Sequence, residues 1–176
     1  MAKFLNGPDL QLITSPPVQV TDLTSPIKNA FESKMELFPG LRQRKFRNQR
    51  NPKQFRYFYD AWKKTSNRTN NSIYYEINDW NRFDRNEICI DIQFWKEFDE
   101  IRDIIKQKKD NIGQKMPLQP KNQLYVNEKN PDWHRLQYIF SDDTDPEIVA
   151  QGLQVLIQET KDVVNEWLKS KKLPHY

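Results

Sequence analysis

The sequence predicts an α+β fold: an antiparallel sheet of about four strands, in the order ββαββα, covered by helices and preceded by two N-terminal helices. Segments 72–78 and 87–95 alternate apolar and polar residues, which is typical of half-buried antiparallel strands. Segments 25–38, 96–112 and 145–169 carry apolar residues at helical spacing. The chain has no glycine-rich phosphate loop, so we do not expect a doubly wound nucleotide-binding fold.

The length of 176 residues is most economically explained by one domain, which we place at residues 25–170. We expect residues 1–24 to form an extended arm, because Pro8, Pro16 and Pro17 disfavour both a helix and a central strand. Residues 171–176 are expected to be a tail. Aromatic residues make up 12% of the chain, and their large burial areas argue against disorder.

Two cap-plus-proline signals predict the N-terminal helices. Ser25-Pro26 begins the first helix, and Pro39-Gly40 ends it. The segment Leu41–Arg50 is expected to be a loop or a continuation into the next element. Asn51-Pro52 then begins a second helix, at about residues 52–65. The core-facing side of that second helix is expected to consist of Phe55, Phe58, Tyr59 and Trp62.

The second half of the chain predicts strand, strand, helix, strand, strand, helix. After the alternating strands, a helix runs to Ile112 and Gly113 ends it. Segments 123–128 and 133–140 form a hairpin. Asp145-Pro146 then caps a helix to about Lys169, which at 1.5 Å per residue is about 35 Å long and is expected to pack across the sheet.

Charge is distributed unevenly along the chain, and this is the strongest functional signal. Residues 41–71 hold ten basic side chains and one acidic side chain, a net charge of +9, within a chain whose net charge is +4. Residues 1–40 and 72–176 carry net charges of −1 and −4. Because the positive charge is local, it is typical of a binding surface for a polyanion such as nucleic acid.

Seven cations and no acid lie between positions 42 and 56 of this basic segment. We expect them to contact phosphates, and we expect the ring of Tyr57, off the apolar face of the predicted helix, to stack on a base. A solvated surface that balances the acidic remainder of the chain is the alternative interpretation. The candidate nucleic-acid-binding residues are Arg42, Arg44, Lys45, Arg47, Arg50, Lys53, Arg56 and Tyr57.

A metal-dependent nuclease would need clustered carboxylates. Glu76, Glu87 and Asp91 lie on the polar sides of the two alternating strands and are the candidates for Mg²⁺. The segment lacks the acid-x-lysine arrangement of restriction-type nucleases, because Asp91 is followed by Ile92 and Gln93. We therefore favour a solvated polar sheet face, and predict neither a metal site nor any other cofactor.

Three further groups have structural explanations. The acids of Ser141–Glu147 suit helix capping and the helix dipole. His134 is expected to be a structural or surface histidine, because nearby Ser141 lacks a nucleophile-elbow context. Cys89 has no adjacent histidine to activate it. We therefore predict no catalytic residue.

No segment is apolar enough for a membrane span, the N-terminus has no signal-peptide pattern, and a single cysteine excludes an internal disulfide. We expect a cytoplasmic protein that does not bind membranes.

Four segments together resemble a prokaryotic domain of unknown function that is often fused to restriction-endonuclease-like modules. They are FRYFYDAWKK, EICIDIQF, FDEIRDIIKQKKDNIG and LYVNEKNPDWHRLQYIF, and the likeness spans about residues 31–169. The chain departs from that pattern after Gly113, where a Trp and a Glu are expected. The resemblance implies a setting in DNA restriction, defence or mobile-element biology and assigns no catalytic residue.

The sequence therefore predicts a non-enzymatic DNA- or RNA-binding or accessory module. Two alternatives remain open: a protein-interaction or structural subunit, with a protein partner or a second copy of the chain bound through the arm and the terminal helix, and a Mg²⁺-dependent nuclease.

Overall fold

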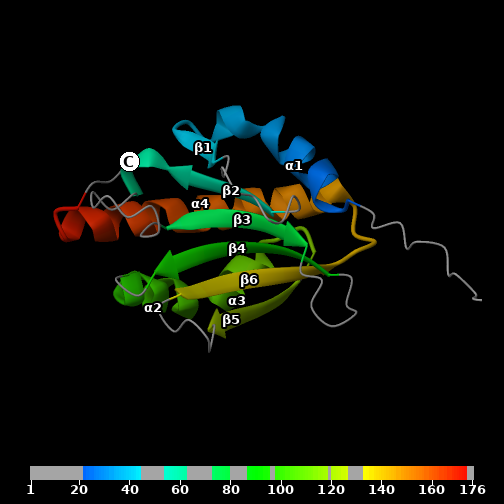
Figure 1. Ribbon diagram of the computed structural model, residues 1–176. Coiled ribbons are helices and arrows are strands. Elements are labelled where there is room, and N and C mark those ends of the chain that lie inside the picture. Colours follow the sequence, from blue (N-terminus) through cyan, green and yellow to red (C-terminus); the bar gives the residue numbers. More distant parts are fainter. Residues whose placement is uncertain are drawn as a thin grey trace, which may run out of the picture.

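One antiparallel sheet of six strands forms the centre of the domain, in the order β1-β2-β3-β4-β6-β5 (Figure 1). The computed structural model describes residues 22–44, 54–62, 73–79, 87–95, 98–118, 120–126 and 133–173, and only the backbone at 44, 121–126 and 133–134. The predicted α+β class with an antiparallel sheet is confirmed, but the predicted number of about four strands is too low. The strands are β1 (Leu41–Arg44), β2 (Gln54–Tyr59), β3 (Tyr74–Asp79), β4 (Glu87–Trp95), β5 (Lys121–Val126) and β6 (Trp133–Ser141).

The two additional strands, β1 and β2, lie where we expected a loop and a helix. Residues 54–59 form an extended strand that ends in the short 3-10 helix η2 (Asp60–Trp62), so the predicted helix at 52–65 is wrong. Aromatic side chains favour strands, and Phe55, Tyr57 and Tyr59 also satisfy the strand period of two. The aromatic residues of this segment therefore fit both the helical period and the strand period, and the spacing alone does not distinguish the two.

The helices largely follow the predicted pattern. α1 (Thr24–Glu32) begins one residue before the predicted Ser25 cap, and the Asp22 carboxylate accepts hydrogen bonds from the Thr24 and Ser25 amides at 3.2 and 3.1 Å. α1 ends at Glu32, before the predicted end at Pro39-Gly40, and the separate 3-10 helix η1 (Met35–Leu37) follows it. The predicted helix after β4 is divided into α2 (Asp99–Gln107) and α3 (Lys109–Gln114). Gly113 lies inside α3 and has no positive φ, so it is not the predicted stop.

The terminal helix α4 (Pro146–Ser170) confirms the prediction most closely. The Asp145 carboxylate caps it by accepting a hydrogen bond from the Glu147 amide at 2.8 Å. Its apolar stripe is buried against α1 and β4. None of the described helices is long and apolar enough to cross a membrane.

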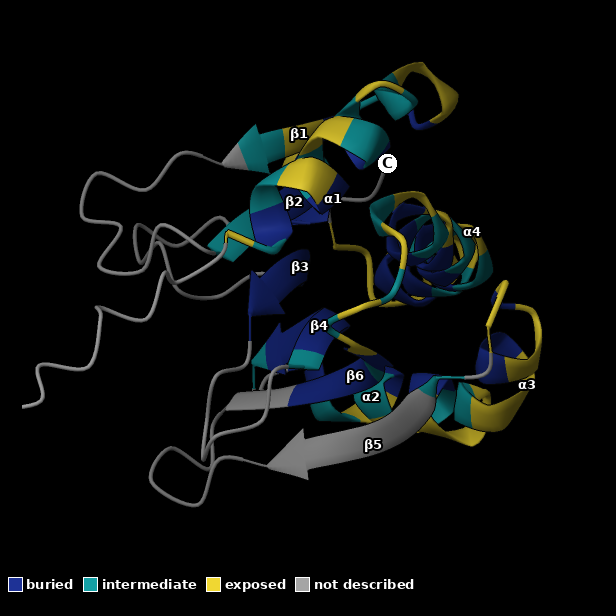
Figure 2. Ribbon diagram, turned by 90° about the vertical axis from the view of Figure 1, so that its right-hand side faces the viewer, coloured by how far each residue is buried: buried dark blue, intermediate teal, exposed yellow. Residues whose placement is uncertain are grey.

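The described helices cover one face of the sheet, as Figure 2 shows for α3 and α4. The core between the layers combines strand residues such as Tyr75, Ile77 and Ile90 with Phe31 and Leu153 from the helices. From β3 onward the chain follows the predicted ββαββα order except that its first helix is split in two, and β1 and β2 extend the sheet at one edge. Residues 1–21 of the predicted arm and 174–176 of the predicted tail lie outside the described residues.

Candidate functional site

The basic segment belongs to the edge hairpin formed by β1 and β2. The hairpin pairs Leu41 with Tyr59 at one end and Arg44 with Arg56 at the other. The chain that joins the two strands therefore leaves and re-enters the sheet beside the Arg44–Arg56 pair. Four of the predicted phosphate contacts, Lys45, Arg47, Arg50 and Lys53, belong to this connection and lie outside the described residues.

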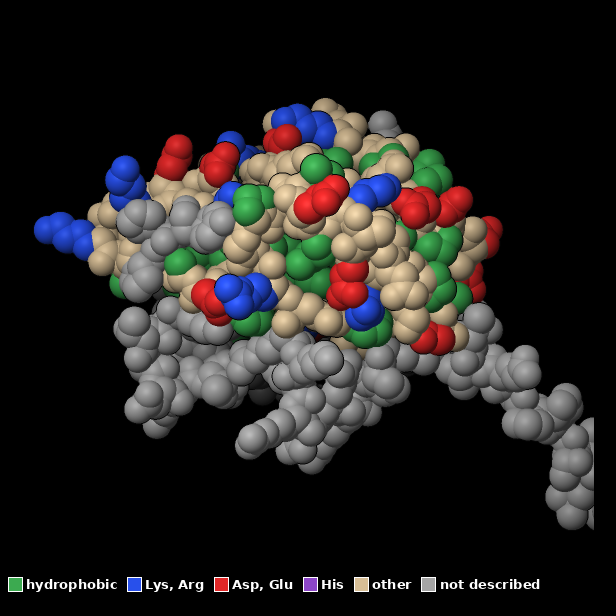
Figure 3. Space-filling model, turned by 90° about the horizontal axis from the view of Figure 1, so that it is seen from above, with side chains coloured by type: hydrophobic (Ala, Val, Ile, Leu, Met, Phe, Trp, Pro, Cys, Tyr) green, Lys and Arg blue, Asp and Glu red, His purple; other side chains and the backbone are tan. Residues whose placement is uncertain are grey.

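The described cations of this segment differ in their surroundings. Arg42 is exposed, with 70% of its side chain accessible, and its guanidinium lies 3.2 Å from the Asp60 carboxylate. Arg44 ends β1, where its backbone faces Arg56. Figure 3 shows side chains of both signs close together on the face seen from above. Elsewhere on the surface, Lys34 pairs with Glu147 at 2.9 Å.

The prediction for Tyr57 is wrong, because its ring is fully buried and not available for stacking. It packs edge-on against Phe31 with 4.8 Å between the ring centroids, and its hydroxyl donates to Glu32 at 3.3 Å. Burial, and then the neighbouring carboxylate, raise the pKa of the phenol. The physical reason is the strand conformation, which turns Tyr57 toward the helices instead of toward solvent.

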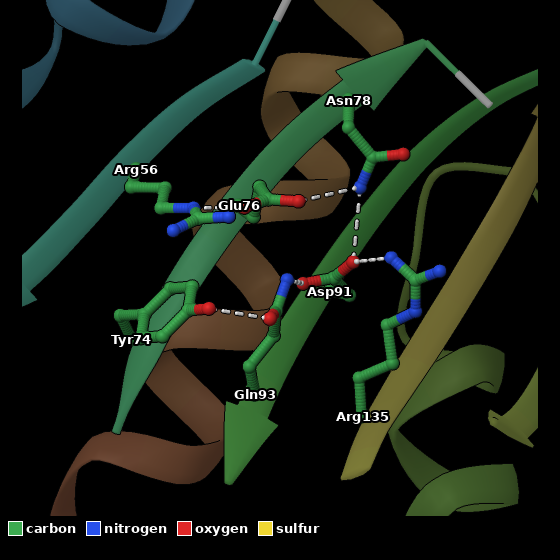
Figure 4. A network of polar contacts seen from close by, with 7 residues as sticks. All are labelled: Arg56, Tyr74, Glu76, Asn78, Asp91, Gln93 and Arg135. Atoms are coloured by element: carbon green, nitrogen blue, oxygen red, sulfur yellow. Dashed lines mark hydrogen bonds and ion pairs between the residues drawn. The ribbon is translucent and has the colours of Figure 1, made fainter. Parts of the chain in front are cut away.

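The face of the sheet opposite the helices carries a buried polar cluster (Figure 4). One row of paired residues crosses the whole sheet and is polar in every strand. In the sheet order β1-β2-β3-β4-β6-β5, it consists of Arg44, Arg56, Glu76, Asp91, Gln137 and Gln123. The side chains of Glu76, Asp91 and Gln137 in this row are at most 1% exposed. We predicted a solvated polar face here, and that prediction is wrong.

Asp91 lies at the centre of this cluster. Its Oδ2 accepts hydrogen bonds from Asn78 Nδ2 at 3.0 Å and from the Arg135 guanidinium at 3.2 Å, and its Oδ1 accepts one from Gln93 Nε2 at 2.9 Å. These donors come from β3, β6 and β4 itself. A buried carboxylate is stable only when it is paired and hydrogen-bonded in this way.

Burial raises the pKa of Asp91 to about 7, with a further contribution in the same direction from the neighbouring Glu76 carboxylate, while Arg135 opposes the shift. Asn78 lies between the two acids, because its Nδ2 also donates to Glu76 Oε1 at 3.1 Å. With both acids ionised, Arg56 and Arg135 balance them. The cluster is therefore neutral in total when Asp91 is charged and positive when Asp91 is protonated.

Two acceptor atoms of the cluster have no hydrogen bond from the part of the chain that the structure describes. They are Oδ1 of Asn78 and Oε1 of Gln137. Unsatisfied buried acceptors are costly and are uncommon in folded proteins. The cluster is thus held by its charged pairs and is not fully satisfied in hydrogen bonding.

The predicted nuclease trio does not converge. Glu76 and Asp91 are cross-strand neighbours, but Glu87 is four residues from Asp91 along β4, a distance of roughly 13 Å at 3.3 Å per residue. Within the described ranges no three His, Cys, Asp or Glu side chains could together hold a metal ion. The two central acids are instead paired with arginines.

The remaining predicted sites have structural roles where they are described. Asp145 caps α4, as expected for the acidic segment before that helix. The Cys89 thiol is buried, and burial raises its pKa, so it is poorly suited to act as a nucleophile. The side chain of His134 lies outside the described residues.

Sequence reasoning identified Glu76 and Asp91 but not Arg135, Gln137 and Asn78 as members of one cluster. Polar residues alternate with apolar ones in β3, β4 and β6, and this alternation could have placed them on one face of the sheet. The pairing register of the strands then brings them next to one another. Comparison with protein-family models, curated proteins and solved structures finds no match for this chain.

Proposed function

We propose that this protein is a non-enzymatic nucleic-acid-binding or accessory module, and that the connection between β1 and β2 contacts phosphates. The observation that carries the proposal is the position of this connection, which joins β1 and β2 at one end of the edge hairpin. Arg44 ends β1 where the connection begins, and the sequence of the connection adds four cations and no acid. Such a dense cationic segment attracts a polyanion without reading its sequence.

The fold supports this location, because an edge hairpin is accessible to an extended polymer. Arg42 is exposed on β1, on the same hairpin. The setting that we propose is DNA restriction, defence or mobile-element biology, which rests on the pattern resemblance alone. The buried cluster around Asp91 is not a candidate phosphate site, because its two arginines are already paired with carboxylates.

The alternative of a protein-interaction subunit has less support. It relied on the arm and on the long terminal helix as contact surfaces. The apolar stripe of that helix is buried within the domain, along α4 from Val149 to Leu168. The described part of α4 therefore presents a mainly polar surface to a partner.

The experiment is a mobility-shift and fluorescence-anisotropy titration with duplex DNA and with single-stranded DNA and RNA over a range of salt concentrations. We expect binding that weakens steeply with salt. The variant Arg44→Ala/Arg47→Ala/Arg50→Ala should reduce the slope of log K against log salt by roughly 2.7, about 0.9 for each phosphate that is no longer neutralised.

The matched control removes the same charge elsewhere, in Lys106→Ala/Lys108→Ala/Lys169→Ala, whose side chains are exposed on the helical side. It should leave the slope unchanged. Absence of binding at low salt, or equal slopes for the two triple variants, would reject the proposed function.

A further inference from the structure

Arg56 is the cation of the basic segment whose surroundings are most completely described, and its guanidinium is engaged on two sides. Its Nε–H donates to the Glu76 carboxylate across the β2–β3 pair. Its planar group also lies over the Tyr74 ring, 4.8 Å from the ring centroid. Arginine is suited to such a site, because its fork matches a carboxylate while its plane stacks on an aromatic ring.

Both partners of Arg56 are fixed in the sheet. Glu76 is 1% exposed and accepts a hydrogen bond from Asn78. The Tyr74 hydroxyl donates to Gln93 on β4 at 2.6 Å. The guanidinium on β2 is therefore joined through β3 to β4, the centre of the sheet (Figure 4).

The charge of Arg56 is also largely compensated where it lies. Only 26% of its side chain is exposed. Burial lowers the pKa of the guanidinium, but the Glu76 carboxylate, with smaller contributions from Tyr74 and Asp91, outweighs burial, so the pKa is raised overall. A phosphate would have to compete with a buried carboxylate for the same donor.

We propose that Arg56 is a positioning residue that holds the basic hairpin to the centre of the sheet, and is not one of its phosphate contacts. The assignment rests on the proposed function of the hairpin. Arg56 faces Arg44, the last residue of β1, so it lies where the basic connection leaves and re-enters the sheet. Holding this point fixes the part of β2 that lies next to the basic connection.

The variant Glu76→Gln distinguishes a phosphate contact from a positioning residue, because the two roles predict opposite changes in the affinity for nucleic acid. If Arg56 contacts phosphate, removing its competing carboxylate frees the guanidinium and tightens binding. If Arg56 positions the hairpin, losing the ion pair loosens the hairpin and weakens binding, although the protein becomes more positive. We expect weaker binding, by roughly tenfold, which corresponds to about 1.4 kcal/mol.

The test measures the affinity for duplex DNA against salt for Arg56→Met, Arg56→Lys and Glu76→Gln. Arg56→Met should weaken binding at every salt concentration without changing the slope, whereas Arg47→Met should reduce the slope by about 0.9. Arg56→Lys should restore part of the affinity, because it keeps the charge but loses the planar fork. Tighter binding by Glu76→Gln, or a reduced slope in Arg56→Met, would overturn the assignment.

A second measurement does not depend on nucleic acid. Amide hydrogen exchange in β1 and β2 should be faster in Arg56→Met and Glu76→Gln than in the parent protein, while exchange at Leu136 in β6 should change little. Far-UV circular dichroism verifies that the variants fold, and Arg56→Lys serves as the milder variant. If the parent protein binds no nucleic acid but exchange changes as expected, the proposed function fails and the anchoring by Arg56 stands. Unchanged exchange in β1 and β2 would reject the anchoring itself.

Discussion

On the helix-covered face of the sheet, Ile77 and Ile90 are cross-strand neighbours at 0% exposure. One residue away along the same strands, on the opposite face, Glu76 and Asp91 are also cross-strand neighbours, at 1% and 0% exposure. The two faces are thus equally buried and chemically opposite. Burying the isoleucines is favourable through the hydrophobic effect, whereas burying the acids has a desolvation cost that their arginine partners offset.

This difference indicates what each face contributes. The apolar face supplies most of the driving force for folding. The polar face makes the strand register specific, because a slip by one residue would move Asp91 among the apolar residues of the core and Ile90 into the polar cluster. If the faces divide these roles, variants on the two faces should differ in stability and in its dependence on pH.

The largest expected effect comes from Arg135→Met. The Arg135 guanidinium and the Asp91 carboxylate are 3.2 Å apart and at most 1% exposed, so this variant leaves a buried charge without its cation. Breaking a buried pair on one side typically costs about 3–5 kcal/mol. The measurement is the free energy of unfolding by urea, with Ile90→Ala, expected to cost about 2–5 kcal/mol, as the matched change on the apolar face.

The double variant Arg135→Met/Asp91→Leu is the control. Replacing both members of a buried pair with apolar residues is often neutral or stabilising, so the double variant should unfold at higher urea concentration than Arg135→Met alone. If the double variant were instead the less stable of the two, the pair would contribute more than charge compensation, and the polar face would be a source of stability like the apolar one.

The second effect is a dependence of stability on pH that the apolar face cannot produce. The pKa of Asp91 is about 7 in the folded protein against 3.8 for the ordinary carboxyl, so between these pH values the folded state binds one proton more than the unfolded state. Stability arising from this group is therefore fully present below about pH 4 and is lost as the pH rises through about 7. The slope is at most about 1.4 kcal/mol per pH unit.

The side-chain carboxyl carbon of Asp91, followed by NMR between about pH 2 and 9, measures this titration directly. In a stability measurement, ordinary carboxylates stabilise the protein as the pH rises, opposite to Asp91. The contribution of Asp91 is therefore the difference in unfolding free energy between the parent protein and Asp91→Asn at each pH. A midpoint near the ordinary value of 3.8 would mean that Arg135 and the hydrogen-bond donors fully offset burial and the Glu76 carboxylate.

The apolar face was predictable from the sequence and the polar face only in part. Ile88, Ile90, Ile92 and Phe94 alternate through β4, and that period alone identifies them as core. The same alternation places Asp91 on the other side, where polarity ordinarily means exposure. Nothing within a single strand indicates that Arg135, 44 residues later, becomes its partner, because strand register is a property of the folded sheet.

The edge hairpin was mispredicted for a related reason. The aromatic residues of β2 satisfy both the helical and the strand period, and Asn51-Pro52 resembles a helix start. Pairing with β1 and β3 decided the outcome, since tertiary contacts override weak local preferences. The basic segment itself was visible from composition, but the burial of Tyr57 and the pairing of Arg56 required the fold.

The smallest expected effect concerns Arg42 and Asp60, an ion pair outside both buried faces. Their charged groups are 3.2 Å apart, much as in the Arg135–Asp91 pair, but the side chains are 70% and 51% exposed. Water and salt screen such a pair, so a double-mutant cycle with Arg42→Ala and Asp60→Ala should give a coupling below about 1 kcal/mol that falls further with added salt. A coupling as large as that of the Arg135–Asp91 pair would show that separation, and not burial, sets the strength of these ion pairs.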